Sequence, residues 1–210
     1  DDQQANLTVL SRMLEKAGHR VVEATSGDEV LDAMDEDHFD LVIIDLHMPG
    51  LSGIDTIKQS RVMQVSGERT PFLILSADAT AETMRAAERA GARAFLTKPI
   101  SISRLLETLA EVSLGSSPSM VKPPTAQEVA SSDNVISKKV LEELEDLQLG
   151  DQFLQVFVDE CVRDSVRCIT EVEKLANAEK WDLFRDQCHA LKGVAENMGA
   201  VQLARAASDT

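Results

Sequence analysis

The sequence predicts two folds in one chain: an α/β domain with a doubly wound parallel sheet over residues 1–112, and an all-α helix bundle over residues 135–210. The first prediction rests on apolar runs that alternate with segments of helical periodicity, as in a parallel sheet with helices on both faces. The second rests on apolar residues that recur at spacings of three and four, with no strand pattern among them. Residues 113–134, rich in Ser and Pro, predict a flexible linker.

Each element of the first domain follows from a local signal. DLVII at 40–44 and PFLIL at 71–75 are continuous apolar runs, which predict strands buried on both faces. Ser26 and Glu29 have the spacing of a capping box and predict the start of a helix, whereas Gly91 predicts the end of another. In chain order we expect a helix through Leu7, Leu10 and Leu14, a strand at 20–25, a helix from Ser26, a strand at 40–44, a helix after Pro49–Gly53, a strand at 71–75, a helix at 81–91, a strand at 94–96 and a helix through Ile102, Leu105, Leu106 and Leu109.

The bundle is expected to contain a short helix through Leu141 and Leu144, two longer helices and a last one over QLARAAS at 202–208. The longer helices carry the apolar stripes Phe153, Phe157, Cys161, Cys168, Val172 and Leu175, then Phe184, Cys188, Leu191, Ala195 and Met198. One more helix would be needed to cover the bundle's apolar face. In the flavodoxin-like strand order 2-1-3-4-5, Asp1 and Asp2 would follow a first strand. We therefore expect the first strand of the sheet and the last helix of the bundle to lie beyond the ends of this sequence.

The composition excludes several classes of function. A formal net charge of −15 argues against nucleic acid as a partner, because phosphate backbones attract a surplus of Lys and Arg. The three cysteines form no CxxC pair and no Cys–His cluster with zinc spacing, which argues against a thiolate metal site. No signal peptide and no long apolar run occurs, so we expect no membrane contact by this segment.

Three polar residues follow three of the expected strands: Asp45, Ser76 and Lys98. Parallel sheets bind their ligands beyond the carboxyl ends of the strands, so these side chains are expected to share one pocket. Phosphoryl transfer to a carboxylate requires a nucleophile, a cation and donors for the phosphoryl oxygens. Asp45 is the expected phosphoacceptor, with Lys98 and Ser76 contacting the phosphoryl group. The expected Mg²⁺ ligands are Asp1, Asp2, Asp45 and the backbone carbonyl of His47.

A second candidate site lies in the bundle at HALKG, where His189, Lys192 and Gly193 share one face of a helix. An exposed neutral imidazole is a good phosphoryl acceptor near pH 7. Lys192 would favour a phosphoryl group nearby, and Gly193 would leave room for a partner to approach closely. A helical histidine taken alone is more often merely exposed or part of a core.

The motifs VIIDLHMPGLSG, LSA and LTKPI resemble the receiver domain of two-component response regulators over residues 1–112. The resemblance implies reversible, Mg²⁺-dependent phosphorylation of Asp45 and a conformational switch through Ser76 and Phe95, which stands where the family often has Tyr. HALKGVAENMGA resembles the motif of histidine phosphotransfer (HPt) domains over residues 137–207. Such domains have no catalytic machinery of their own, because the docked receiver supplies the Mg²⁺ and the acidic residues.

A receiver followed by an HPt domain is similar to the C-terminal part of hybrid sensor histidine kinases, and within them to the quorum-sensing kinases that detect diffusible signal factor. This resemblance implies a relay from a kinase histidine to Asp45, then to His189, then to an aspartate of a separate response regulator. The implied partners are the kinase core of the same parent protein, the downstream regulator and the signal-synthesising enzyme. The implied location is the cytoplasmic side of a parent anchored in the inner membrane. The chain itself lacks the kinase core.

Two alternatives remain open at the level of sequence. A haloacid-dehalogenase-type phosphatase also uses an aspartate at a strand end with Mg²⁺, but it needs a second acid two residues later, where this chain has His47. A docking scaffold without phosphoryl transfer would keep its partners after replacement of Asp45.

Overall fold

The computed structural model describes residues 1–64, 69–77, 80–98, 100, 102–114, 119–120, 151–197 and 199–208. The chain divides into two compact units, each taken over its described residues. Unit 1 comprises Asp1–Asp2 and Ala24–Ala126, and unit 2 comprises Gln3–Glu23 and Gln127–Thr210. None of the helices in these described ranges is long and apolar enough to cross a lipid bilayer.

Unit 1 is built on a parallel sheet. Its strands are β1 (Val42–Asp45), β2 (Phe72–Ser76), β3 (Ala94–Thr97) and β4 (Ser119–Met120), in the order β1-β2-β3-β4. In the ladders, Asp45 pairs with Leu75 and Ser76 pairs with Thr97, so the carboxyl ends of the first three strands meet at one edge. The prediction of a doubly wound parallel sheet is confirmed for the strands that the structure describes.

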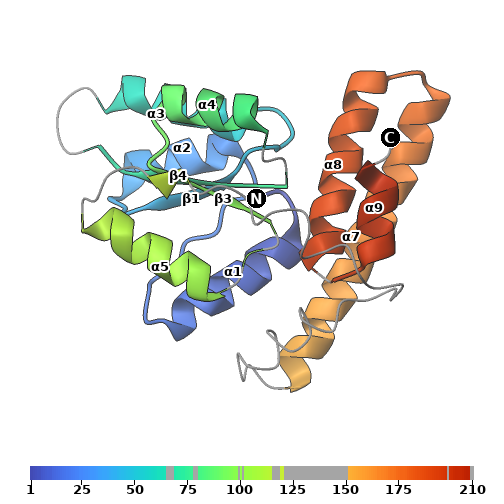
Figure 1. The fold of residues 1–210 in the computed structure, drawn as a ribbon, viewed down its shortest axis with the longest axis horizontal. Helices are drawn as coiled ribbons and strands as arrows, with labels where there is room; N and C mark the ends of the chain where they lie inside the picture. The colour runs from blue at the N-terminus through green and yellow to red at the C-terminus, as the bar shows by residue number, and fades with distance from the viewer. Residues whose placement is uncertain are drawn as a thin grey trace. The chain divides into compact units, whose positions relative to one another are not determined.

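Four helices cover this sheet: α2 (Gly27–Glu36), α3 (Gly53–Met63), α4 (Ala81–Ala90) and α5 (Ile102–Ser113). Figure 1 shows α3 and α4 on one face and α5 on the other. The predicted start of α2 is present, because the Ser26 hydroxyl accepts a hydrogen bond from the Glu29 backbone N–H at 3.2 Å. The α4 helix ends at Gly91, whose φ of 98° lies in the left-handed region that favours glycine.

Apolar side chains are buried on both faces of the sheet of unit 1, and one cluster joins the sheet to α2, α3 and α4. All five residues of β2 are buried, as the continuous run PFLIL predicts for a strand covered on both faces. Ile44 of β1, Ile57 of α3 and Phe95 of β3 belong to the same apolar cluster as Phe72. This packing fixes the sheet edge on which the site is built.

Two expectations differ from the structure. Residues 20–25 form no strand, and Val22 is 54% exposed. A strand is stabilised by the ladder that it forms with a neighbour, and none of the four described strands pairs with these residues. Conversely, β4 lies inside the predicted linker and pairs with β3, because the backbone at the sheet edge accepts a partner of almost any sequence. The rest of the linker after residue 120, and the short helix through Leu141 and Leu144, lie outside the described residues.

Unit 2 contains α1 (Gln4–Lys16), α7 (Asp151–Asn177), α8 (Trp181–Asn197) and α9 (Val201–Ser208). The predicted stripes are largely buried in it, through the side chains of Phe157, Cys161, Cys168, Leu175, Cys188, Leu191 and Ala195. The sequence places the first helix in the α/β domain, whereas the contacts of α1 group it with the bundle. One polar contact within this unit joins α1 to α7: the carboxylate of Asp164 accepts a hydrogen bond from the Ala5 N–H at 3.1 Å, in the first turn of α1.

Candidate functional site

The first site lies where three neighbouring strands end. Asp45 is the last residue of β1, Ser76 is the last of β2, and Lys98 follows β3 directly. The backbone N–H of Lys98 donates to the Ser76 carbonyl at 2.9 Å, and that of Leu46 donates to the Leu75 carbonyl at 3.0 Å. The parallel ladders therefore continue one residue past the strands and bring the three predicted side chains to one edge.

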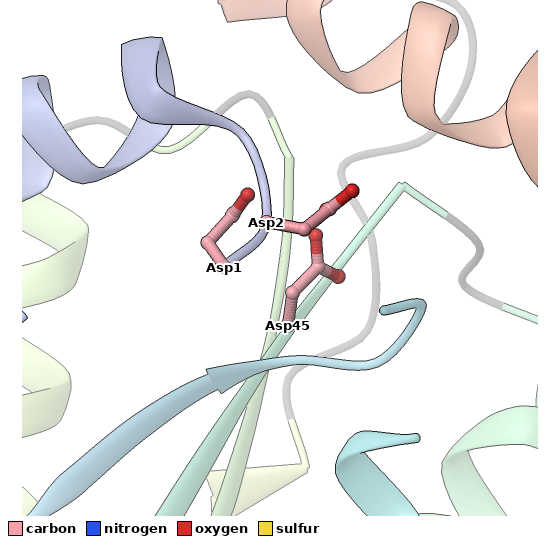
Figure 2. Close-up of side chains that lie close together, drawn as sticks. All are labelled: Asp1, Asp2 and Asp45. Carbon is pink, nitrogen blue, oxygen red and sulfur yellow. The ribbon is translucent and has the colours of Figure 1, made fainter. Parts of the chain in front are cut away.

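Three carboxylates gather at this edge. The ligand atoms of Asp1, Asp2 and Asp45 all lie within 4.8 Å of one another, and Figure 2 shows the three side chains close together beyond the end of β1. Burial raises the pKa of the Asp2 carboxyl, and the Asp45 carboxylate raises it further. Both effects make the ionised form of Asp2 less favourable unless a cation lies beside it.

Lys98 supplies one such cation. Its Nζ lies 2.7 Å from Asp1 Oδ2 and 2.7 Å from Asp45 Oδ2, and its side chain is only 4% exposed. Charge-assisted bonds of this length are strong, and burial shields them from water. The site therefore holds three carboxyl groups beside the ammonium of Lys98. Oxygen ligands of this kind fit Mg²⁺.

The other predicted pocket residues are placed as follows. The His47 backbone N–H donates to Asp45 Oδ1 at 3.3 Å, which helps to orient that carboxylate. The use of the His47 carbonyl as a metal ligand stays a prediction. Ser76 and Phe95 are both fully buried, Phe95 within the apolar core. Their roles in phosphoryl contact and switching also stay predictions.

The structure adds one residue that sequence reasoning used only as a helix boundary. A Cβ at Gly53 would lie 2.2 Å from the carbonyl oxygen of Asp45, closer than any side chain tolerates. The Gly53 N–H also donates to the Leu46 carbonyl at 3.0 Å. The start of α3 therefore packs directly on the backbone of the expected phosphoacceptor. The signal in the sequence is the glycine-rich turn between Pro49 and Gly53, but only the geometry shows what it does.

The second site lies on α8 in unit 2. His189 is half-buried, and Lys192 and Gly193 lie one turn further on, on the same side of a continuous helix. Lys192 Nζ lies 3.9 Å from Glu196 Oε1. A Cβ at Gly193 would meet nothing within 4 Å, so packing in unit 2 does not require glycine there. A mid-helix glycine costs about 1 kcal/mol relative to alanine, which points to a need outside the helix itself.

Two domain families match the chain. The response regulator receiver domain matches residues 1–110, which include the carboxylate site and Lys98. The Hpt domain matches residues 152–209, which include His189, Lys192 and Gly193. Each match therefore covers one of the two sites that the structure shows.

Comparison with curated proteins and solved structures agrees with both matches. The sensory/regulatory protein RpfC of Xanthomonas campestris pv. campestris is 47% identical over 206 residues, which are 97% of this chain and 28% of RpfC. The chain thus spans little more than a quarter of that relative. The receiver domain of sensor histidine kinase PA1611 from Pseudomonas aeruginosa, solved with a magnesium ion in its active-site cleft, has a TM-score of 0.50 and 27% identity, covering 55% of this chain and 93% of that one. A chain of the Saccharomyces cerevisiae complex between the histidine phosphotransfer protein Ypd1 and the receiver domain of Ssk1 has a TM-score of 0.50 and 26% identity, covering 54% and 85%.

Proposed function

Because this chain belongs to the response regulator receiver family and carries an Hpt domain after the receiver, we propose that it passes a phosphoryl group between Asp45 and His189. The observation that carries the proposal is the buried cluster in which Lys98 binds both Asp1 and Asp45 at 2.7 Å. Asp45 is the only member of this cluster at the end of a strand, and its backbone is fixed by Gly53.

Asp45 acts as the nucleophile. One carboxylate oxygen attacks the phosphorus of a donor phosphohistidine, a P–O bond forms, and the N–P bond breaks to release neutral or protonated imidazole. Lys98 and the Ser76 hydroxyl stabilise the negative charge on the phosphoryl oxygens in this step. Phe95 changes its packing when Ser76 moves toward the phosphoryl group.

Mg²⁺ is the cofactor of this step. Asp1, Asp2, Asp45 and the carbonyl of His47 would hold it, and the gathering of three carboxylate ligand atoms within 4.8 Å supports a divalent ion with oxygen ligands. When bound, Mg²⁺ offsets the repulsion between the carboxylates and the incoming phosphoryl oxygens. The magnesium in the PA1611 receiver supports the same assignment here.

His189 receives the group from Asp45 by the reverse chemistry. Its imidazole nitrogen attacks the acyl phosphate, the carboxylate of Asp45 leaves, and Lys192 favours the new phosphohistidine by its charge. Gly193 leaves the helix surface open, so the receiver backbone can come close to the histidine. His189 then donates to an aspartate of a separate response regulator.

The likeness to RpfC supports a parent protein of the same kind. We infer a hybrid sensor kinase whose kinase core phosphorylates Asp45 and whose membrane anchor lies outside this chain, with the present segment on the cytoplasmic side. A signal-synthesising enzyme that binds the receiver is the further partner we propose, since the receiver surface would then report the state of Asp45.

Intact-mass analysis after incubation with acetyl phosphate and Mg²⁺ tests the relay. The wild-type chain should gain one phosphoryl group, Asp45→Ala should gain none, and His189→Ala should gain one that stays on Asp45. Asp35→Asn and His38→Ala remove an exposed carboxylate and an exposed imidazole that have no part in either proposed role, and both should behave as wild type. Turnover of many acetyl phosphates without a phosphorylated intermediate would favour a phosphatase. A folded chain that binds Mg²⁺ and partners but takes up no phosphoryl group from any donor would favour a scaffold.

A further inference from the structure

We infer that Glu196 is a positioning residue of the histidine site: by holding the ammonium of Lys192, it lowers the stability of a phosphoryl group on His189 relative to one on an aspartate. The inference rests on the proposed function, since it concerns the stability of phosphorylated His189. Glu196 lies within the stretch HALKGVAENMGA, but the proposed transfer gives it no part.

The three side chains share one surface of α8. Residues 189, 192 and 196 are spaced by three and by four, which places them one above another on a helix. Lys192 Nζ lies 3.9 Å from Glu196 Oε1, and the two side chains are only 24% and 19% exposed. Partial burial reduces screening by water and salt, so the charges act on each other more strongly than on an open surface.

Helix stability does not account for a glutamate at this position. Glu196 is the second-last residue of α8, where the negative end of the helix dipole disfavours a carboxylate. A glutamate four residues after a lysine is also the weaker of the two orders for such an ion pair. Two independent features of the helix thus oppose Glu196, and its partner Lys192 is the residue that the phosphoryl group needs.

Phosphorylation changes the partner of Lys192. The phosphoryl group on His189 brings about two negative charges to within one turn of the ammonium. Lys192 is then shared between the phosphoryl oxygens and the Glu196 carboxylate, so the phosphoryl group gains less from the ammonium than it would without Glu196. When the N–P bond breaks and the new O–P bond forms on an aspartate, Lys192 returns to Glu196. The Glu196 carboxylate therefore favours transfer of the phosphoryl group from His189 to an aspartate.

The test measures the equilibrium ratio of phospho-His189 to phospho-Asp45 in the full chain with acetyl phosphate and Mg²⁺. Glu196→Gln keeps the shape and removes the charge, and it should raise the ratio about 3- to 10-fold. Glu196→Asp keeps the charge and should restore a ratio closer to that of wild type. Glu173→Gln removes an exposed carboxylate from α7 and should leave the ratio unchanged.

A double-mutant cycle with Lys192→Met separates the routes of action. If Glu196 acts through the ammonium, Glu196→Gln should change the ratio much less in the Lys192→Met background. An unchanged ratio in Glu196→Gln, with normal loading of Asp45, would overturn the inference. A lower thermal midpoint with an unchanged ratio would do so too, because it would reduce Glu196 to a structural residue. Absence of any phospho-His189 in wild type would instead contradict the proposed function.

Discussion

Lys98 supplies positive charge to the carboxylate site in the absence of a metal ion. Its ammonium is the cation at 2.7 Å from both Asp1 and Asp45, in a site where their side chains are 5% and 12% exposed. Removing one partner from a buried ion pair leaves uncompensated charge, which is more costly than loss of an exposed pair.

We therefore expect Lys98→Met to lower the free energy of unfolding by about 3 kcal/mol in EDTA. Excess Mg²⁺ should recover much of this loss, because it supplies the missing positive charge, so the Mg²⁺-induced rise in thermal midpoint should be larger than in wild type. Lys58→Met is the matched control: Lys58 pairs with Asp55 at 2.9 Å but is 60% exposed, and its loss should change stability by no more than about 0.5 kcal/mol. Equal losses from the two variants would contradict this account.

Positions that follow from the end of a strand could be predicted from sequence, whereas their chemical roles stay predictions. Asp45, Ser76 and Lys98 each follow an apolar run, and parallel strands bring their carboxyl ends to one edge of the sheet. The contacts of Gly53 and Glu196 could not be predicted in the same way. Gly53 lies close to the backbone of Asp45 and Glu196 lies close to the side chain of Lys192, and neither contact leaves a periodic pattern.

At the scale of elements, the contact between α3 and β1 sets the position of Asp45. A Cβ at Gly53 would meet the Asp45 carbonyl oxygen at 2.2 Å, and backbone atoms cannot move aside as a flexible side chain can. We expect Gly53→Ala to destabilise unit 1 by about 1–3 kcal/mol, as overpacking does, and to slow phosphorylation of Asp45 at least about 10-fold.

Gly50→Ala is the comparison for this prediction. Gly50 has a φ of 80° and no atom within 4 Å of an added Cβ, so alanine there adds backbone strain without a steric contact. It should cost about 1 kcal/mol and leave the phosphorylation rate within a few-fold of wild type. Stopped-flow phosphorylation and urea unfolding of both variants measure the difference. Equal rates in the two variants would show that the approach of α3 does not position Asp45.

Cys161 is buried where α7 packs in unit 2, and its burial should make the free energy of unfolding fall at alkaline pH. Burial raises the pKa of the Cys161 thiol to about 12, whereas the pKa of a cysteine in an unfolded chain is about 8.5. The native state thus keeps a proton that the unfolded state loses. The contribution of this thiol is fully present below about pH 8.5 and declines as the pH rises toward 12.

Urea unfolding at about pH 7.5 and pH 10 should therefore show a loss of about 1–2 kcal/mol that is absent in Cys161→Ala. Below pH 8, the native thiol should resist iodoacetamide and react only after unfolding. Rapid alkylation of native Cys161 would contradict its burial. The comparison of Cys161→Ala with wild type at each pH isolates this residue from Cys168 and Cys188.

Elements were predictable where the sequence carries its own signal, such as a cap, a glycine or an apolar run. The capping box at Ser26, the end of α4 at Gly91 and the buried strand β2 all agree with the structure. Strands that depend on a neighbour are different. The run at 20–25 has strand composition but no ladder, and β4 has a ladder but no strand composition. Pairing, which is not a local property, decided both outcomes.

At the scale of the whole molecule, we expect the predicted linker to determine which histidine receives the phosphoryl group from Asp45. Ser113 belongs to α5 and residues 119–120 pair with β3, so the predicted tether begins after Met120. Residues 121–134 lie outside the described residues, and their composition predicts a flexible chain. A flexible chain of 14 residues would have a root-mean-square span of about 21 Å. Such a tether gives an effective concentration on the order of 1 mM, so transfer within one chain should far outrun transfer between chains in dilute solution.

The wild-type rate of transfer from Asp45 to His189 should accordingly be independent of protein concentration. A mixture of Asp45→Asn and His189→Gln chains can transfer only between molecules, and its rate should rise in proportion to concentration. At about 10 µM the mixture should be about 100-fold slower than wild type. A wild-type rate that rises linearly with concentration would mean that the tether does not deliver His189 to its own receiver. The bundle would then serve a receiver on another chain, and the order of the two domains would matter less for the relay than the oligomeric state of the parent.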